Sequence, residues 1–365
     1  MSTPAILYIH DLRGSGVVTN AIALARSLGA ERETILVAGY GTGLNRHVDV
    51  SPARLVVLDE GPEPTRPRVK AARALRRVMH RTGAGLVMSM GNFGHSTVFA
   101  ATRWSRARTV YRVSNEIGRP RAGFRNFRRR NWQRLLLATA DRIVLVGRAL
   151  AEQPLFKRAV HDGKAAYIAN GVDVGKARRE RDAAVPHAWF EDGGPPVVLA
   201  IGRIHPQKNL EGLFAGVALA MRETPLRLLV VGSGPPDRVA ALKVHAKDLG
   251  IDAALQFAGE TDNVFAWLAR AQAFALVSHW EGSSTALLEA MAVGVPVVAS
   301  RQAGDARFVL DEGRYGVLVD GKDPASIAAG LLQQLGDHPI TSGDRVDHYR
   351  LSVTHQRYLD LIRPL

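Results

Sequence analysis

Short apolar runs alternate with helical stretches along the chain, and this alternation most constrains the fold. Continuous runs rich in Val, Ile and Leu between helical segments are typical of parallel sheets that are covered on both faces. The sequence therefore predicts an α/β fold. The expected strands are residues 6–9, 35–38, 55–58, 86–89, 109–113 and 143–146 in the first half, and 197–201, 227–231, 255–257, 273–277, 296–299 and 316–319 in the second.

The alternation restarts after a polar stretch at residues 175–196, which we interpret as a hinge. A chain of 365 residues exceeds one ordinary hydrophobic core, so two domains are expected. We predict two Rossmann-like domains that face each other across a cleft, residues 1–174 and 175–345. Ligands of such folds bind at the carboxyl ends of the strands.

Composition excludes several classes of protein. The sequence has no cysteine, which rules out disulfides, thiolate metal sites and cysteine nucleophiles. Its longest apolar runs are far shorter than a membrane-spanning helix requires. The first 12 residues have neither a basic start nor a long apolar stretch, so no secretory signal is expected. The simplest expectation is a soluble protein of the cytoplasm.

Positive charge is concentrated in the first half. The formal net charge is +14, but residues 1–175 carry 28 Lys and Arg against 12 Asp and Glu, and the rest of the chain is slightly acidic. Residues 66–134 hold 18 basic residues and one acidic residue, Glu116. Such asymmetry indicates an anionic partner of the first domain: a membrane, a nucleic acid or an acidic substrate.

The segment HWEGSSTALLEAMAVGVPVVAS carries the strongest chemical signal. It follows an expected strand and leads into an expected helix, whose N-terminus presents free N–H groups suited to a phosphate. Glu281 lies just before this helix and Glu289 inside it, so both carboxylates can accept hydrogen bonds from sugar hydroxyls. A capped helix with one solvated glutamate explains the same pattern about as well.

The segment GRIHPQKNL follows the expected strand at 197–201 directly. Arg203 and Lys208 bracket a short loop, and Asn209 is a plausible N-cap of the next helix. Two cations beside a helix start, in a mildly acidic domain, indicate a diphosphate clamp. Two solvated surface cations are the alternative.

Taken in order, NGVD at residues 170–173, GRIHPQKNL, VGSGP, FAG and the EGSSTALLEAMAVGVPVVAS segment resemble the retaining GT-B glycosyltransferases of family 4, also called glycosyl transferases group 1. The resemblance spans the second half, and residues 349–362 resemble the final helix of the family. It implies that residues 346–365 cross back to the N-terminal domain, which would bind the acceptor while the C-terminal domain binds a nucleotide-sugar.

The resemblance also implies roles for individual residues. Arg203 and Lys208 would bind the donor diphosphate, Glu281 the transferred sugar and Glu289 the ribose. The loop residues whose backbone amides would meet sugar and phosphate are Ser283, Ser284 and Thr285, and Gly259 lies in the segment that would meet the nucleobase. The two serines leave the identity of the sugar open, since many relatives have an aromatic residue, glycine or proline in this loop.

Three segments of the first half match the family more loosely. Gly14 and Gly16 would let the backbone approach a phosphate or acceptor, although a glycine turn for packing is as plausible. His95, in GNFGH, occupies a position where relatives place a residue near the transferred sugar, and a histidine satisfied at a helix start is the alternative. Arg112 and Asn115 follow the next strand and are candidate acceptor contacts, as is Glu116, unless it only pairs with an arginine.

The segment RPRAGFRNFRRRNWQRLLL combines seven arginines with aromatic and leucine side chains. Arginines attract anionic headgroups and the apolar side chains can enter the interface. A solvated basic face is the plainer reading. The candidate contacts with an acceptor-bearing anionic membrane are Arg125, Arg128, Arg129, Arg130 and Trp132.

No Asp-x-Asp pair and no histidine cluster with ligand spacing occurs, so a metal-independent reaction without a cofactor is expected, with the nucleotide-sugar as co-substrate. We expect transfer to an acceptor hydroxyl of a lipid-linked glycan in cell-surface polysaccharide or glycolipid synthesis, at the cytoplasmic face of the membrane. The alternatives are a nucleotide-sugar epimerase or hydrolase on the same fold, a silent GT-B scaffold, and a basic membrane- or RNA-binding protein without catalysis.

Overall fold

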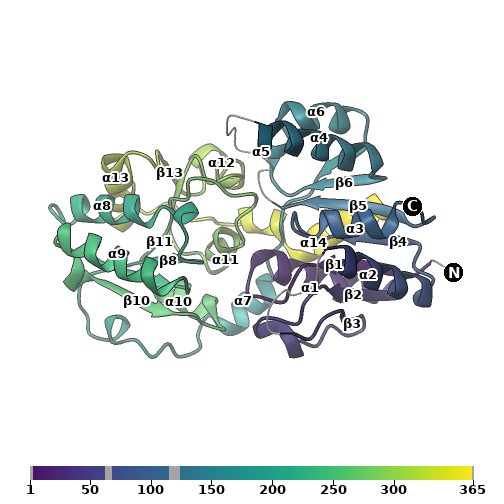
Figure 1. Ribbon diagram of the computed structural model, residues 1–365. Helices are drawn as coiled ribbons and strands as arrows, with labels where there is room; N and C mark the ends of the chain where they lie inside the picture. The colour runs from purple at the N-terminus through teal and green to yellow at the C-terminus, as the bar shows by residue number, and fades with distance from the viewer. Residues whose placement is uncertain (1–2, 62–67, 115–123, 364–365) are drawn as a thin grey trace. The chain divides into compact units, whose positions relative to one another are not determined.

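The computed structural model describes residues 3–61, 68–114 and 124–363 and divides the chain into two compact units (Figure 1). Unit 1 comprises Met1–Asn170 and Ser352–Leu365, and unit 2 comprises Gly171–Leu351. Each unit is built on its own parallel sheet covered by helices. The predicted α/β fold class is therefore confirmed.

Unit 1 contains a seven-stranded sheet with the order β3-β2-β1-β4-β5-β6-β7. Every strand pair is parallel, with Ala5 paired with Thr34 on one side and with Leu86 on the other. The strands are β1 (Ala5–Ile9), β2 (Thr34–Ala38), β3 (Arg54–Val57), β4 (Leu86–Ser89), β5 (Arg108–Val113), β6 (Arg142–Leu145) and β7 (Ala165–Tyr167).

Helices cover both faces of this sheet. The helices are α1 (Gly16–Gly29), α2 (Arg68–Thr82), α3 (His95–Thr102), α4 (Phe124–Thr139), α5 (Arg148–Ala151), α6 (Pro154–His161) and α14 (Leu351–Ile362), the last of which belongs to unit 1 from Ser352 on. Side chains of α1 and α14 pack on Leu7 and Ile9, whereas those of α2 and α3 pack on Ile6 and Tyr8. Alternate residues of β1 thus serve the two cores, as a strand period of two requires.

Unit 2 repeats this plan with a six-stranded parallel sheet of order β10-β9-β8-β11-β12-β13. Its strands are β8 (Val197–Ile201), β9 (Arg227–Val231), β10 (Leu255–Gly259), β11 (Ala273–Leu276), β12 (Val297–Ser300) and β13 (Val317–Val319). Its helices are α7 (Val174–Glu180), α8 (Leu210–Ala220), α9 (Pro236–Asp248), α10 (Val264–Arg270), α11 (Thr285–Val293), α12 (Ala306–Val309) and α13 (Pro324–Leu335). The buried side chains of α8 and α13 pack together on one face of the sheet.

The chain passes between the units at residues 170–171 and 351–352, so the hinge expected at residues 175–196 is wrong. This stretch lies inside unit 2 and contains α7. The ring of His187 contacts those of Trp189, Phe190 and Trp267 at 5.4–5.8 Å, which fastens the stretch to α10. The polar residues at 175–196 therefore belong to a segment that packs on unit 2, and they do not connect the two units.

Candidate functional site

An ion pair joins two loops of unit 2. Lys208 Nζ lies 2.8 Å from Glu281 Oε1, and both side chains are largely buried. Lys208 follows β8 and Glu281 follows β11, and these strands are neighbours at the centre of the sheet. Because both strands end at the same edge, residues 73 positions apart meet there.

Two side chains that sequence reasoning did not single out hold Glu281 in place. Ser278 Oγ donates to Oε1 at 2.9 Å, and Gln207 Nε2 donates to Oε2 at 3.2 Å. Gln207 Nε2 also donates to the Trp280 carbonyl at 2.8 Å. Gln207 stands inside the GRIHPQKNL motif, and Ser278 directly follows a buried strand, so position was the signal that could have identified them.

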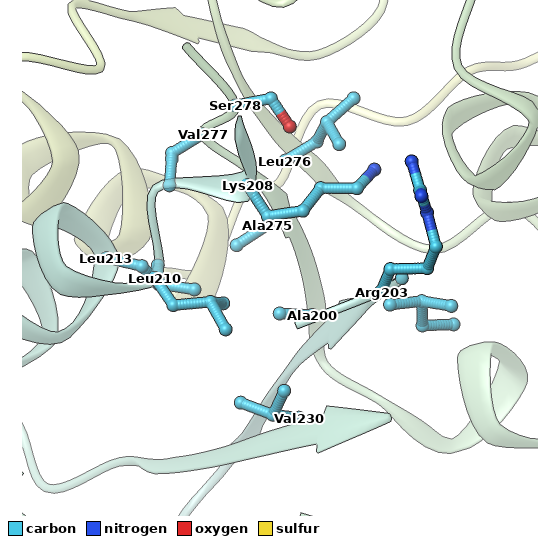
Figure 2. Close-up of a pocket in the computed structure, with 12 residues that line it drawn as sticks. Ala200, Arg203, Lys208, Leu210, Leu213, Val230, Ala275, Leu276, Val277 and Ser278 are labelled. Atoms are coloured by element: carbon cyan, nitrogen blue, oxygen red, sulfur yellow. The ribbon is translucent and has the colours of Figure 1, made fainter. Parts of the chain in front are cut away.

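Arg203 is exposed, and no carboxylate of the described residues pairs with it. Together with Lys208 and Ser278 it lines a pocket at the ends of β8 and β11 (Figure 2). Figure 2 shows the Arg203 and Lys208 side chains extending from separate segments into the same region. The pocket therefore offers one free cation and one cation that is shared with a carboxylate.

Asn209, the expected N-cap of α8, does not cap that helix with its side chain. Its φ is 54°, and its Nδ2 donates to the carbonyls of Val277 at 3.1 Å and Gly321 at 2.7 Å. The side chain instead fixes the cation loop to the ends of β11 and β13. Asn209 thus occupies the expected N-cap position, but its side chain does not cap the helix because its amide donates to these distant carbonyls.

Helix α11 begins next to Glu281. Ser284 is its N-cap, with Oγ accepting from Leu287 N at 3.4 Å, and Ser283 and Ser284 are buried. Thr285 is the first helical residue, so the first backbone N–H groups of α11 lie in the predicted loop. The structure thus brings Lys208, Glu281 and this helix start together.

Glu289 lies in the second turn of α11 and is half-buried. Burial raises the pKa of Glu289 to about 7, and the positive charge of Lys176 opposes the shift. Its carboxylate has no hydrogen-bond partner among the described residues. A carboxyl group in this state accepts or donates a hydrogen bond depending on pH near neutrality.

The two predicted glycines lie in separate units. Gly259 ends β10 with a φ of 77°, and a Cβ there would meet no atom within 4 Å. Its exposed backbone leaves open space at the expected nucleobase loop. Gly16 is the first residue of α1 in unit 1, where Ser15 Oγ accepts from Val18 N at 3.3 Å.

His95 begins α3 and is buried in unit 1, with 4% of its surface exposed. Its Nδ1 lies 2.8 Å from Ser89 Oγ, and its buried Nε2 has no hydrogen-bond partner. Burial lowers the pKa of His95 to about 3, and the charge of Arg112 lowers it further. The imidazole is therefore neutral at physiological pH, and only one of its two ring nitrogens has a hydrogen-bond partner.

Arg112 is not available to an acceptor or a membrane, because only 1% of its surface is exposed. Its Nε donates to Tyr358 Oη at 3.0 Å, its Nη1 to the Met90 carbonyl at 2.9 Å and its Nη2 to Asn170 Oδ1. The expected surface contact is corrected to a buried link between β5, the end of unit 1's first segment and α14.

Trp132 is partly buried and makes packing contacts within unit 1. Its ring meets Phe99 edge-on at 5.2 Å and covers the core formed by α2 and α3. The other expected contacts of this segment cannot be placed in the same way. Asn115 and Glu116 lie outside the described residues, and Arg125, Arg128, Arg129 and Arg130 lie in α4 with side chains outside them.

Two further findings concern only the described part of the chain. No group of three or more His, Asp or Glu residues there is arranged to hold a metal ion. None of its helices is both long and apolar enough to cross a lipid bilayer.

Comparison with known proteins shows a similarity to one family over part of the chain. Residues 195–337, which contain the Lys208–Glu281 pair and α11, match the model of the family described as "Glycosyl transferases group 1". Over these residues the chain is similar to the group 1 glycosyltransferases. The match lies in unit 2, where the cation pocket is located.

The curated relatives that this chain matches have several different names. The chain is 31% identical over 235 residues to a D-inositol 3-phosphate glycosyltransferase of Corynebacterium kroppenstedtii, which covers 60% of the chain and 52% of the relative. It is 32% identical over 182 residues to a GDP-mannose-dependent alpha-(1-6)-phosphatidylinositol monomannoside mannosyltransferase of Mycolicibacterium smegmatis, covering 47% of each. The chain thus spans about half the length of the curated relatives it matches.

Solved structures establish the same fold over the whole chain. HepE from Anabaena, crystallised with UDP and glucose, superposes with a TM-score of 0.81 at 17% identity and covers 100% of both chains. Sucrose-phosphate synthase from Thermosynechococcus elongatus gives a TM-score of 0.81 at 19% identity and covers 100% of this chain and 99% of its own. At such identity the likeness shows the fold alone, which is the GT-B fold.

Proposed function

We propose that this chain transfers a sugar from a nucleoside-diphosphate sugar to an acceptor hydroxyl. The arrangement of Arg203, Lys208 and Glu281 at one sheet edge carries the proposal, because two cations line one pocket and a carboxylate is paired with one of them. The cations suit a diphosphate and the carboxylate suits sugar hydroxyls. Curated relatives in the same family are themselves named glycosyltransferases, one of them GDP-mannose-dependent.

The site suggests how the leaving group is stabilised. Breaking the bond between sugar and diphosphate builds negative charge on the leaving diphosphate and positive charge on the sugar carbon. Arg203, Lys208 and the N-terminus of α11 would meet the negative charge, and Glu281 would lie beside the sugar. We propose a retaining reaction without a metal, in which the leaving diphosphate takes the proton of the incoming hydroxyl.

The fixed position of Glu281 matters for this role. Three side chains, those of Gln207, Lys208 and Ser278, donate hydrogen bonds to its carboxylate. A carboxylate that is already oriented needs little rearrangement when a donor binds, so its hydrogen bonds can favour one sugar geometry. Bound diphosphate would draw on the Lys208 charge and weaken its hold on Glu281.

Substitution of Glu281 tests the assignment. Glu281→Gln removes the charge and keeps the shape, and we expect sugar transfer to fall about 100-fold or more. Glu223→Gln, on an exposed residue after α8, is the matched control and should leave transfer unchanged. Turnover of UDP- and GDP-sugars by the two variants is the measurement. Unchanged turnover in Glu281→Gln would show that the site is assigned wrongly.

The cations are tested by binding. Arg203→Ala should weaken nucleoside-diphosphate binding about tenfold or more, since a free cation then disappears from the pocket. Arg222→Ala removes an exposed arginine elsewhere in unit 2 and serves as the control. Titration calorimetry with UDP, GDP and ADP compares the variants and also identifies the nucleotide. Equal affinities of the two variants would contradict the diphosphate assignment.

We further propose that the acceptor is lipid-linked and that unit 1 meets an anionic membrane from the cytoplasmic side. The supporting surface differs from the one expected from sequence. No acidic residue occurs between residues 68 and 114, and eight Lys and Arg residues of this stretch are exposed: Arg68, Lys70, Arg73, Arg77, Arg81, Arg103, Arg106 and Arg108. Trp104 stands among them, 74% exposed, with the Arg103 guanidinium 4.2 Å from its ring.

Vesicle binding tests this surface. Wild-type protein should bind phosphatidylglycerol vesicles and release them as salt rises, because each exposed cation near the surface contributes about 1 kcal/mol. Arg73→Glu with Arg77→Glu should abolish binding, while Lys243→Glu with Lys247→Glu in unit 2 should retain it. Equal binding by both double variants would contradict the surface, and binding to RNA in place of vesicles would contradict the membrane.

A further inference from the structure

Three aromatic rings gather at the carboxyl edge of the unit 1 sheet. His10 follows β1, Tyr40 follows β2 and Phe93 lies between β4 and α3. The strands are adjacent in the order β2-β1-β4 (Figure 1). The His10 ring lies 5.1 Å from Tyr40, edge to face, and 5.9 Å from Phe93, tilted by 34°.

Phe93 is unusually exposed for a phenylalanine, at 74%. A large apolar ring that faces water loses the stabilisation that burial would give, so its placement calls for a reason. Tyr40, by contrast, is 3% exposed and supports His10 from below the surface. The Tyr40 ring is thus buried, the His10 ring half-buried and the Phe93 ring exposed.

The loop that carries Phe93 is held rigidly. Asn92 Oδ1 accepts from Ser114 N at 3.0 Å, and Gly94 N donates to the Gly91 carbonyl at 2.9 Å. A Cβ on Gly94 would come within 2.9 Å of the Tyr8 and Ser89 side chains, so the backbone is pressed against the strands. Phe93 therefore projects from a fixed base and needs no ordering when it meets a ligand.

Polar groups border the rings. Asp11 follows His10, and its Oδ1 accepts from Arg13 N at 3.2 Å while Oδ2 lies 3.7 Å from Arg13 Nε. This ion pair is partly exposed and its contact is weak, so the Asp11 carboxylate can accept hydrogen bonds from the hydroxyl groups of a ligand instead. Burial lowers the pKa of His10, so its ring is neutral near pH 7 and can both donate and accept a hydrogen bond.

We propose that Phe93 and His10, with Asp11 at their border, form an acceptor subsite that binds the ring of a cyclic polyol, either a pyranose or a cyclitol. The C–H face of such a ring stacks on Phe93, and its hydroxyls reach His10 and Asp11. An exposed aromatic ring beside a few convergent polar groups is the usual composition of a small-molecule site. The inference rests on the proposed transfer reaction for its meaning, but its binding step does not require turnover.

Saturation-transfer NMR on the full chain tests the subsite with methyl α-D-glucopyranoside, methyl α-D-mannopyranoside and myo-inositol as probes. Wild-type protein should give a signal with at least one probe, strongest at the ring C–H protons. Phe93→Ala should weaken that probe's binding about tenfold, and Phe93→Tyr should restore it. Val244→Ala, at an exposed apolar residue of unit 2 (61%), is the control and should match wild type.

The outcomes separate this inference from the proposed function. Titration with UDP or GDP should give the same affinity for Phe93→Ala and wild type, because the donor residues lie in unit 2. No signal with any probe, or equal signals from wild type and Phe93→Ala, would overturn the subsite. If the wild-type protein transfers no sugar but still binds the probe, the proposed function is overturned and the subsite is retained.

Discussion

Individual side chains in this protein take their roles from neighbours that lie far away in the sequence. Arg112 follows the pattern of a surface-exposed acceptor contact, yet Tyr358 and Asn170, 246 and 58 positions away, enclose it. Lys208 matches a phosphate ligand, yet it shares its charge with Glu281. The residue type limits the chemistry that a side chain can perform. The packing around it determines which groups that side chain contacts.

Glu289 gives a prediction at this scale. Its carboxyl releases a proton near pH 4.5 in the unfolded chain and near pH 7 in the native one. Between these values the native state holds more protons, so wild-type stability falls as pH rises and levels off above 7. Relative to wild type, Glu289→Gln should gain at most about 3 kcal/mol over this window. Denaturant unfolding at several pH values measures it, and parallel profiles would contradict it. Glu223→Gln is the control.

Arg112 gives a second prediction. Arg112→Met leaves the Met90 carbonyl and Tyr358 Oη buried without the Arg112 donor, and we expect a loss of about 2–4 kcal/mol in unfolding free energy. Arg54→Met, at an exposed arginine of β3, should change it by about 0.5 kcal/mol or less. Chemical denaturation compares them. A similar small loss in both variants would show that the buried network contributes little.

At the scale of elements, periodic segments were predicted well and their contacts were not. The expected helix at 286–293 is α11, which starts one residue earlier at Thr285, and the strand at 197–201 is β8 without change. Strand β7, Ala-Ala-Tyr, was missed because three residues carry too little apolar signal. Asn209 is the N-cap residue of α8 as expected, but its side chain does not cap the helix because its acceptors lie at the ends of β11 and β13.

The loop after β12 gives a prediction about the site. Gly304 has a φ of 59°, and a Cβ there would lie 2.5 Å from the Glu281 carbonyl oxygen. Gly304→Ala should therefore move the Glu281 backbone and weaken UDP or GDP binding. Gly343→Ala meets the same positive φ, at 49°, but no atom within 4 Å. Both should lose about 1 kcal/mol of stability from backbone strain, and only the first should lose affinity. Calorimetry distinguishes them, and equal affinities would contradict the steric argument.

At the scale of the whole molecule, the last helix belongs to the first unit. Tyr358, Leu359 and Ile362 of α14 pack in the same core as α1 and β1. Their spacing of one, three and four positions places them on one helix face. The family resemblance implied a returning helix, and the structure supplies its contacts. A segment at the end of the chain thus completes a core begun by its first strand.

This arrangement predicts which unit loses stability when a core side chain is shortened. Leu359→Ala should cost about 2–4 kcal/mol and lower hydrogen-exchange protection in residues 3–170 while unit 2 keeps its protection. Ile327→Ala, in the unit 2 core, should show the reverse pattern. Hydrogen exchange with mass spectrometry localises both effects. Uniform loss over both units in either variant would show that they unfold as one.

The sequence by itself determined the α/β class, the two sheets and the resemblance to one family, because apolar periodicity and short motifs are local properties. It also identified Arg203, Lys208, Glu281 and Glu289 as the donor-site candidates, since the first three follow strand ends and Glu289 lies in the helix that comes next. Only the tertiary structure decided that Lys208 pairs with Glu281, that Arg112 is buried and that Phe93 is held out from the surface. Those outcomes depend on which loops meet at a sheet edge, and contacts between distant segments are not written in any local pattern.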